Sequence, residues 1–349
     1  MTPPCLTAQR WERLLQRSDE FTCYSAAMAT WLAAADDDWA PLVNPGLWLR
    51  LTEEPDGLFG FGYFAPTLRA RLGLARTGAD QPDTALDGIL SELGRSGRVI
   101  VAADGHNLPW HVAAGREHLP HWFVLAGNPA ALEIADPFAC RNELGTQTVE
   151  HRSVDVASLT AMLSALPGIN PVHRLREVLA FGDRSDDALE HRYQWFVESE
   201  VHTTQEPAGV DGPGAVRRLA AHFREHRQDA DAYRQADDIW SIARHRAFLL
   251  GCERADAQAQ AQAQAQDEPG RAEWGQEHAA PLARKWGHIA PLLMQATLSV
   301  RAGRAPSSSV PDTLERLAQM EENAIGAAAQ SSFTIRGRRC AERVVGGAS

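Results

Sequence analysis

The sequence predicts an α+β fold for an N-terminal domain of residues 1–150, followed by a mainly helical C-terminal domain of residues 151–349. In the first part, helical patterns come first and three strand candidates follow. Short, hairpin-like spacing separates these strands, which indicates an α+β domain. After about residue 155 the apolar residues recur at helical spacing, which indicates a change to helices.

The elements of the N-terminal domain follow from local patterns. The alanine-rich segment 23–35 reads as a helix that ends at the acidic run 36–38. Glycines alternate with aromatic residues within 57–74, which suggests extended chain in close backbone contact. The expected helices span residues 6–17, 23–35 and 83–95, and the expected strands span residues 98–104, 121–127 and 131–136.

The C-terminal domain is expected to contain helices of three or more turns after a Pro-Gly stop at 167–168. Residues 257–270, a run of alternating Ala and Gln followed by DEPG, are of low complexity. They are too polar to bury, so we expect a mobile connection between helices. The expected helices lie around residues 186–200, 214–226, 228–252, 273–302 and 311–329.

Charge and composition exclude some classes of function. The formal net charge of -11 argues against a nucleic-acid partner, which would require a concentrated basic face. Such acidity suits a cationic or amine-bearing small substrate. No run approaches the roughly 18 apolar residues of a membrane span. The N-terminus lacks the basic and apolar regions of a secretory signal, so we expect a cytoplasmic protein.

The position of Cys23 points to nucleophilic chemistry. The chain has five scattered cysteines without a CxxC pair, so free thiols are expected. Cys23 follows the helix-capping residues Ser18, Asp19 and Thr22 and precedes an apolar helical run. The positive end of the helix dipole favours a thiolate there, and the same N–H groups would serve as an oxyanion hole. The alternative is a small buried helix residue.

A hairpin supplies a candidate base and the acid that holds it. In residues 121–136 the turn is centred on 127–130, and regular pairing would put His121 directly opposite Asp136. Cross-strand neighbours have Cβ atoms about 4.5–5.5 Å apart, close enough for a carboxylate to bind an imidazole N–H. Strand alternation makes these two groups end an otherwise apolar row. A one-residue bulge would break this pairing, and a surface Asp–His pair is the alternative.

Together these three residues predict a catalytic triad. A base held by an acid, with a helix-terminal thiol far upstream, is the general arrangement of a nucleophilic site. Cys23 would be the nucleophile, His121 its base and Asp136 the group that orients the histidine. The order Cys, His, Asp, with the last two on a hairpin, is that of papain-like folds.

The chain also shows a resemblance to a known family, which rests on FTCYSAAMATWL (21–32), LFGFGYF (58–64), VIVAADGHNLPW (99–110) and HWFVLAGNPAALEIADPF (121–138). These segments resemble the N-terminal domain of the butirosin-biosynthesis BtrH-like acyltransferases, a branch of the papain-like thiol fold. The helical half is similar to the domain of unknown function that usually follows, through FGDRSDDALEHRYQWF (181–196), GPGAVRRLAAHF (212–223) and YRQADDIWSIARH (233–245).

The resemblance implies a reaction of natural-product biosynthesis. In the founding member, an acyl group on the phosphopantetheine arm of an acyl carrier protein passes to an aminoglycoside amine. By matching position, Cys23 would accept the acyl group, His121 would shuttle protons and Asp136 would orient His121. The expected partners are an acyl carrier protein or other acyl thioester donor and a small-molecule amine. No cofactor is expected beyond the carrier's phosphopantetheine, and a homodimer is left open.

The sequence departs from related thiol enzymes in two places. Related peptidases have a glutamine about six residues before the cysteine, whereas Gln16 lies seven before Cys23, which leaves its oxyanion role in doubt. The glycine-rich block is also unusually aromatic, so Phe61 and Tyr63 are expected to shape the acyl pocket.

Further residues are candidates for contact with the substrate. Asp104 could hold an ammonium group before attack, with Trp110 in the same block, although a turn residue at a strand end explains Asp104 equally well. Tyr24 could shape the site, or it could simply begin the helix. His106, His111 and His118 flank this loop, but their spacing matches no standard ligand geometry, so no metal site is expected.

Two alternative functions remain open from the sequence. A thiol hydrolase of the same fold would release the acyl group to water instead of an amine, which depends on how dry the pocket is. A non-catalytic protein could instead bind a carrier domain through its helical half. Carrier docking would use an arginine cluster, either Arg69, Arg71 and Arg76 or Arg336, Arg338 and Arg339, although each cluster also reads as an ordinary solvated face.

Overall fold

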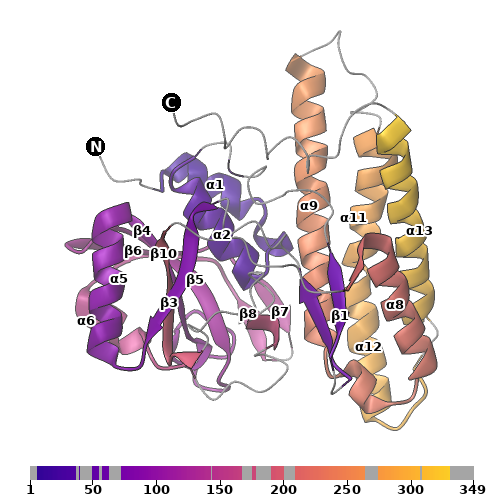
Figure 1. Ribbon diagram of the computed structural model, residues 1–349, viewed down its shortest axis with the longest axis horizontal. Coiled ribbons are helices and arrows are strands. Elements are labelled where there is room, and N and C mark those ends of the chain that lie inside the picture. The colour runs from indigo at the N-terminus through magenta and orange to yellow at the C-terminus, as the bar shows by residue number, and fades with distance from the viewer. Residues whose placement is uncertain are drawn as a thin grey trace. The chain divides into compact units, whose positions relative to one another are not determined.

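The computed structural model describes residues 6–36, 39, 49–54, 57–62, 72–142, 144–166, 175–177, 190–199, 209–263, 274–306 and 309–330. The chain divides into two compact units, and each unit combines two separate stretches of sequence. The first unit comprises Met1–Val43 and Pro66–Gln205, and the second comprises Asn44–Ala65 and Glu206–Ser349. Figure 1 shows the mixture of helices and strands, which agrees with the α+β expectation.

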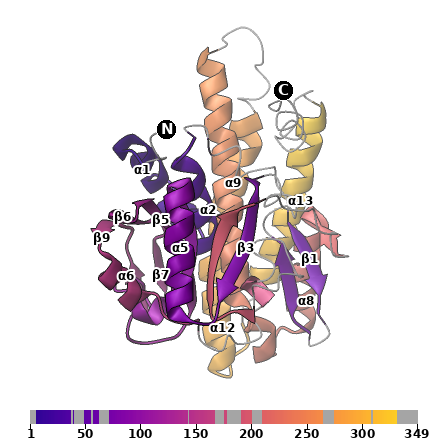
Figure 2. The ribbon, with the colours of Figure 1, turned by 60° about the vertical axis from the view of Figure 1, so that its left-hand side comes forward.

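The first unit is built on a six-stranded antiparallel sheet. Alternation along a strand sends neighbouring side chains to opposite faces. Val101 of β4 belongs to the core cluster that includes Ile89 of α5, whereas Arg98 lies over the ring of Trp31 in α2. The helices α5 (Pro82–Ser96) and α2 (Cys23–Ala33) therefore cover opposite faces, as Figures 1 and 2 show. The sheet order is β3 (Leu74–Ala79), β10 (Tyr193–Glu198), β4 (Arg98–Asp104), β5 (Pro120–Asn128), β6 (Ala131–Asp136) and β9 (Glu150–Val154).

Smaller elements surround this sheet, and most of the expected elements of this region are present. The helices expected at 6–17, 23–35 and 83–95 and the strands expected at 98–104, 121–127 and 131–136 are confirmed, with small shifts at their ends. The remaining elements are α1 (Ala8–Leu15), α6 (Val156–Met162), the strand pair β7 (Cys140–Asn142) and β8 (Gly145–Gln147), and 3-10 turns at Ser18–Glu20 and Gly105–Asn107.

Strand β10 corrects two expectations. A helix was expected around 186–200, but Tyr193–Glu198 pairs with β3 along six residues and with β4 at Gln194 and Trp195. Its aromatic and β-branched residues suit a strand between two neighbours, so long-range pairing overrides the helical pattern. Because β10 completes the sheet of the first unit, that unit extends past the boundary expected at residue 150.

The β5–β6 hairpin has a register shifted by two residues from the expected one. Asn128 pairs with Ala131 and Leu125 pairs with Ile134, so the turn is centred on 129–130. Gly127 has a φ of 101° and its Cβ position would meet the carbonyl oxygen of Ala131, so only glycine fits. His121 is therefore not directly opposite Asp136. A shift of two keeps every side chain on its expected face.

The second unit combines a short antiparallel sheet with helices. The hairpin of β1 (Arg50–Glu53) and β2 (Phe59–Gly62) pairs with β11 (Val210–Asp211), which leads into α8. A buried polar group joins the helices, because the Glu321 carboxylate accepts hydrogen bonds from Arg246 and the Trp286 indole, each at 3.0 Å. The helices are α8 (Gly212–Glu225), α9 (Ala236–Ala263), α11 (Ala280–Gly287), α12 (Ile289–Arg301) and α13 (Ser309–Gln330).

Three helix expectations for the second unit need correction. The segment expected as one helix over 273–302 contains a π-helical turn at Gly275–Ala279, then α11 and α12. The helix expected at 228–252 begins later, after a 3-10 turn at Ala230–Tyr233. Helix α9 then continues through 257–263 of the Ala/Gln run, because both residue types are good helix formers. Within the described residues, no helix is long and apolar enough to cross a membrane.

Candidate active site

Cys23 is the first residue of helix α2, as the sequence predicts. Thr22 caps the helix: its hydroxyl accepts from the Ser25 backbone N–H at 3.1 Å, while the Ser25 hydroxyl accepts from the Thr22 N–H at 2.8 Å. This reciprocal capping box fixes the first turn. Cys23 itself is partly exposed, and none of the described residues accepts a hydrogen bond from its backbone N–H. That N–H is available to stabilise an oxyanion beside the sulfur.

His121 and Asp136 form a buried pair. The His121 Nε2 and the Asp136 Oδ2 lie 2.7 Å apart, although the two residues are not direct cross-strand neighbours. The side chains are 1% and 0% exposed, respectively. An ionised carboxylate can only accept hydrogen bonds, so this contact puts the imidazole proton on Nε2 and leaves Nδ1 as the basic nitrogen. Among the described residues, no group hydrogen bonds to Nδ1.

Asp136 is surrounded by donors. Its Oδ2 accepts from the Trp110 indole N–H at 2.8 Å and from the Gln147 amide at 3.3 Å, in addition to His121. Its Oδ1 accepts from the Phe138 backbone N–H at 3.1 Å. Four donors around one acceptor-only group hold the carboxylate, and through it the imidazole ring, in one orientation.

The thiol of Cys23 lies beside the strand that carries His121. A hydrogen bond from the backbone of Trp122, the residue after His121, reaches the Cys23 sulfur and lowers the pKa of the thiol. The net effect of the surroundings is nevertheless to raise that pKa. The first cause is that the protein shields the thiol from water, although the residue as a whole is partly exposed, and the next is the negative charges of Glu177 and Asp136. The position at a helix N-terminus was expected to favour a thiolate, but these larger effects outweigh it.

Glu177 is the residue of this region that the sequence reasoning missed. It is 1% exposed, and burial raises the pKa of its carboxyl group, opposed by Arg76 and by hydrogen bonds from Tyr24 and Trp122. The only local signal is an Arg–Glu pair between apolar residues in LREVL, 175–179, which also fits an ordinary exposed helix face. Contact with residues far away in the sequence carries no such signal.

The expected substrate-binding residues lie in several different surroundings. Trp110 is buried, and its indole N–H donates to Asp136, which supports the His121–Asp136 pair. The Tyr24 hydroxyl donates to Glu177. Phe61 lies in β2 of the second unit, where it is buried near Phe59. Tyr63 lies outside the described residues.

The Asp104 carboxylate makes hydrogen bonds within the loop that follows β4. Its Oδ1 accepts from the backbone N–H groups of His106 and Leu119, and its Oδ2 lies 2.6 Å from the His118 Nδ1. The carboxylate is 2% exposed. These contacts give Asp104 the role of a strand-end turn residue, which was the alternative to holding an ammonium group.

His111 packs against the proposed base. The ring centroids of His111 and His121 are 4.5 Å apart, and the His111 Nδ1 accepts from the Ala113 N–H at 3.1 Å. Burial and the neighbouring His121 lower the pKa of His111 to about 2, so this ring stays neutral. In the described part of the chain, no three His, Cys, Asp or Glu residues are grouped to hold a metal ion.

Only Arg76, of the six arginines expected to dock a carrier, lies within the described residues. Arg76 is 6% exposed, and its guanidinium lies over the rings of Trp122 and Phe196 at 5.2 and 5.6 Å. It is therefore a core residue of the first unit. The other five arginines, Arg69, Arg71, Arg336, Arg338 and Arg339, lie outside the described residues.

No protein-family model matches this chain, and no curated protein matches it either.

Proposed function

We propose that the protein is a cysteine-dependent acyltransferase that moves an acyl group from a thioester to the amine of a small molecule. The observation that carries the proposal is the buried His121–Asp136 pair, which leaves Nδ1 as the basic nitrogen, next to the strand position that contacts the Cys23 sulfur. A helix-terminal thiol beside the strand that carries a buried histidine supports a papain-like arrangement, and the motifs of the BtrH-like acyltransferases support the same interpretation.

The first half-reaction would acylate the enzyme. His121 Nδ1 takes the proton of the Cys23 thiol as the sulfur attacks the thioester carbonyl carbon. The resulting oxyanion is stabilised by the Cys23 N–H at the first turn of α2. When the tetrahedral intermediate collapses, the bond to the donor sulfur breaks, and the imidazolium returns its proton to that departing thiolate. The products are acyl-Cys23 and the free thiol of the donor.

The second half-reaction would transfer the acyl group. The amine nitrogen attacks the carbonyl carbon of acyl-Cys23 while His121 removes a proton from the nitrogen. The carbon–sulfur bond then breaks, and Cys23 regains its proton from the imidazolium. The net result is an amide and a free thiol, with no oxidant or reductant required. Asp136 orients the ring and stabilises its positive charge in both steps.

The donor proposed for this chemistry is the phosphopantetheine thioester of an acyl carrier protein, and the acceptor is an amine-bearing small molecule. Motif resemblance supports the donor. The formal net charge of -11 supports a cationic acceptor, because an acidic surface attracts ammonium groups.

Intact-protein mass spectrometry tests the proposal. Wild-type protein incubated with the acetyl thioester of N-acetylcysteamine is expected to gain the mass of one acetyl group. Cys23→Ala is expected to gain none, whereas Cys140→Ala, which removes another partly exposed thiol, is expected to be acetylated normally. Absence of an adduct on the wild type refutes the proposal.

A second measurement separates transfer from hydrolysis. After excess thioester is removed, the acetyl-enzyme is incubated with and without hydroxylamine as the amine. Transfer predicts a stable adduct in buffer that hydroxylamine discharges as the hydroxamate. Loss of the adduct in buffer alone, at the same rate as with hydroxylamine, supports a thiol hydrolase instead.

A further inference from the structure

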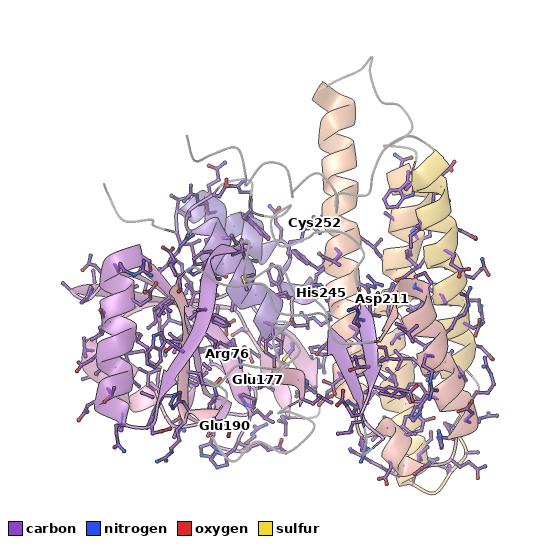
Figure 3. All side chains as sticks on the ribbon, in the orientation of Figure 1. Arg76, Glu177, Glu190, Asp211, His245 and Cys252 are labelled. Atoms are coloured by element: carbon purple, nitrogen blue, oxygen red, sulfur yellow. The ribbon has the colours of Figure 1, made fainter. Side chains whose placement is uncertain are left out.

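Glu177 is a buried carboxylate of the first unit that the proposed chemistry does not use. Its Oε1 accepts from the Tyr24 hydroxyl, and its Oε2 accepts from the Trp122 indole N–H at 2.8 Å. Its backbone carbonyl accepts from the Arg76 Nη2 at 2.9 Å. Figure 3 labels Arg76 and Glu177, which lie side by side. Both oxygens of the carboxylate are thus occupied by side chains from other elements.

The two donors are the sequence neighbours of the nucleophile and the base. Tyr24 immediately follows Cys23 on α2, and Trp122 immediately follows His121 on β5. Glu177 lies 153 residues after Tyr24 and 55 after Trp122, so a third segment joins the other two. The backbone of Trp122 also contacts the Cys23 sulfur. One carboxylate therefore ties α2 to β5 next to the two residues between which the proposed reaction moves a proton.

The chemistry of this position requires two hydrogen-bonding atoms on one side chain. Two carboxylate oxygens accept from both donors at once, and an amide would also serve both, because the Tyr24 hydroxyl can accept from an N–H group. An apolar side chain would leave both donors unsatisfied in the interior. The carboxylate is costly here, because it is desolvated and because its negative charge opposes a Cys23 thiolate. A charged group buried at such a cost is better explained by the geometry it imposes than by packing.

We propose that Glu177 is a positioning residue: by binding Tyr24 and Trp122 together, it holds α2 against β5 so that the Cys23 sulfur stays within reach of His121. This inference rests on the proposed acyl transfer, because only proton transfer and attack require that distance to be fixed.

The test compares two reactions of the same thiol in Glu177→Leu, which removes both hydrogen bonds together with the charge. Acetylation by the acetyl thioester of N-acetylcysteamine requires His121 in place, so its rate is expected to fall about 100-fold, the loss typical of a misplacement near 1 Å. Alkylation by iodoacetamide requires only an accessible thiolate. Its pH profile at Cys23 is expected to move to lower pH, because a negative charge has been removed.

Two controls distinguish positioning from a loss of stability. Glu321→Gln alters a comparable buried carboxylate with a tryptophan donor in the second unit, and it is expected to leave both reactions of Cys23 unchanged. Tyr24→Phe is expected to slow acetylation, and adding it to Glu177→Leu is expected to cause little further loss, since both changes remove the same hydrogen bond between residues 24 and 177.

The outcomes distinguish failure of the positioning role from failure of the proposed function. A folded Glu177→Leu protein that is acetylated at the wild-type rate overturns the inference and leaves the proposed function standing. If the wild type is not acetylated at all, the proposed function fails, and the inference that rests on it fails as well.

Discussion

Replacing Asp136 tests whether the site needs a group that only accepts hydrogen bonds. Asp136 is 0% exposed, and its four contacts come from His121, Trp110, Gln147 and the Phe138 backbone, all of which can donate. An asparagine can turn its oxygen toward the three groups at Oδ2, but its amide then faces the Phe138 N–H. One donor is left facing another, which costs about 1–3 kcal/mol. In Asp136→Ala every donor loses its partner, and a loss of about 3–5 kcal/mol is expected.

These free energies convert into a measurable order of unfolding temperatures. For a unit of this size, each 1 kcal/mol lowers the midpoint by about 2–4 °C. The expected order is wild type, then Asp136→Asn, then Asp136→Ala, measured by differential scanning calorimetry. Glu133→Gln is the matched control on the same strand. Its half-exposed side chain pairs with His151 at 3.4 Å, and its loss is expected to leave the midpoint unchanged.

The same variants are predicted to differ in chemistry. Asp136→Ala releases the His121 ring, so acetylation of Cys23 should fall by about 100-fold or more. Asp136→Asn, in its favoured orientation, keeps an oxygen beside the His121 Nε2, so its acetylation rate should fall less than that of Asp136→Ala. The reasoning is refuted if Asp136→Asn is as stable as the wild type, or if the alanine variant acetylates faster than the asparagine variant.

Two further predictions concern buried polar groups elsewhere. The pKa of His111 is about 2 in the folded protein, whereas its ordinary value is 6.5. As the pH falls below about 6.5, the His111 side chain therefore binds a proton in the unfolded chain but not in the folded protein. Stability is therefore lost toward acid, by up to about 1.4 kcal/mol per pH unit, and His111→Asn should flatten the dependence of the melting temperature on pH between 4 and 6.5. In the second unit, Glu321→Ala should lower the free energy of unfolding, measured by urea denaturation, by about 3–5 kcal/mol, because it leaves the buried Arg246 without its carboxylate partner. The double variant Arg246→Met with Glu321→Leu should recover most of that stability.

Local signals in the sequence were sufficient to predict where α2 begins and that β5 and β6 form a hairpin. Thr22 is a capping residue before an apolar run, and the run begins where the cap predicts. The hairpin register was wrong by two residues, yet His121 and Asp136 still meet. An even shift preserves the face of each side chain, and a carboxylate can bridge the diagonal distance that results.

Long-range contacts account for what the sequence could not predict. Tyr193–Glu198 becomes a strand because β3 and β4 leave a place between them, which no local pattern records. Trp110 was expected to contact the substrate, but it lies in the loop after β4 and its indole donates to Asp136 at the end of β6. Glu177 is the clearest example, because its role depends on donors 153 and 55 residues away.

The two carboxylates near Cys23 would act differently on the proton transfer of the proposed reaction. A helix N-terminus contributes about 0.3–1 kcal/mol toward a thiolate. The raised pKa of the Cys23 thiol shows that shielding from water and the nearby negative charges outweigh this effect. In the proposed reaction the proton would therefore leave only as the sulfur attacks. Moving it to His121 would bring positive charge directly against Asp136, which is hydrogen bonded to the ring, so Asp136 would favour the transfer on balance. Among the described residues, Glu177 has no hydrogen bond to the ring, and its negative charge opposes the thiolate. Its electrostatic effect on the step would be unfavourable, so a benefit to catalysis would have to come from the positioning role proposed for it.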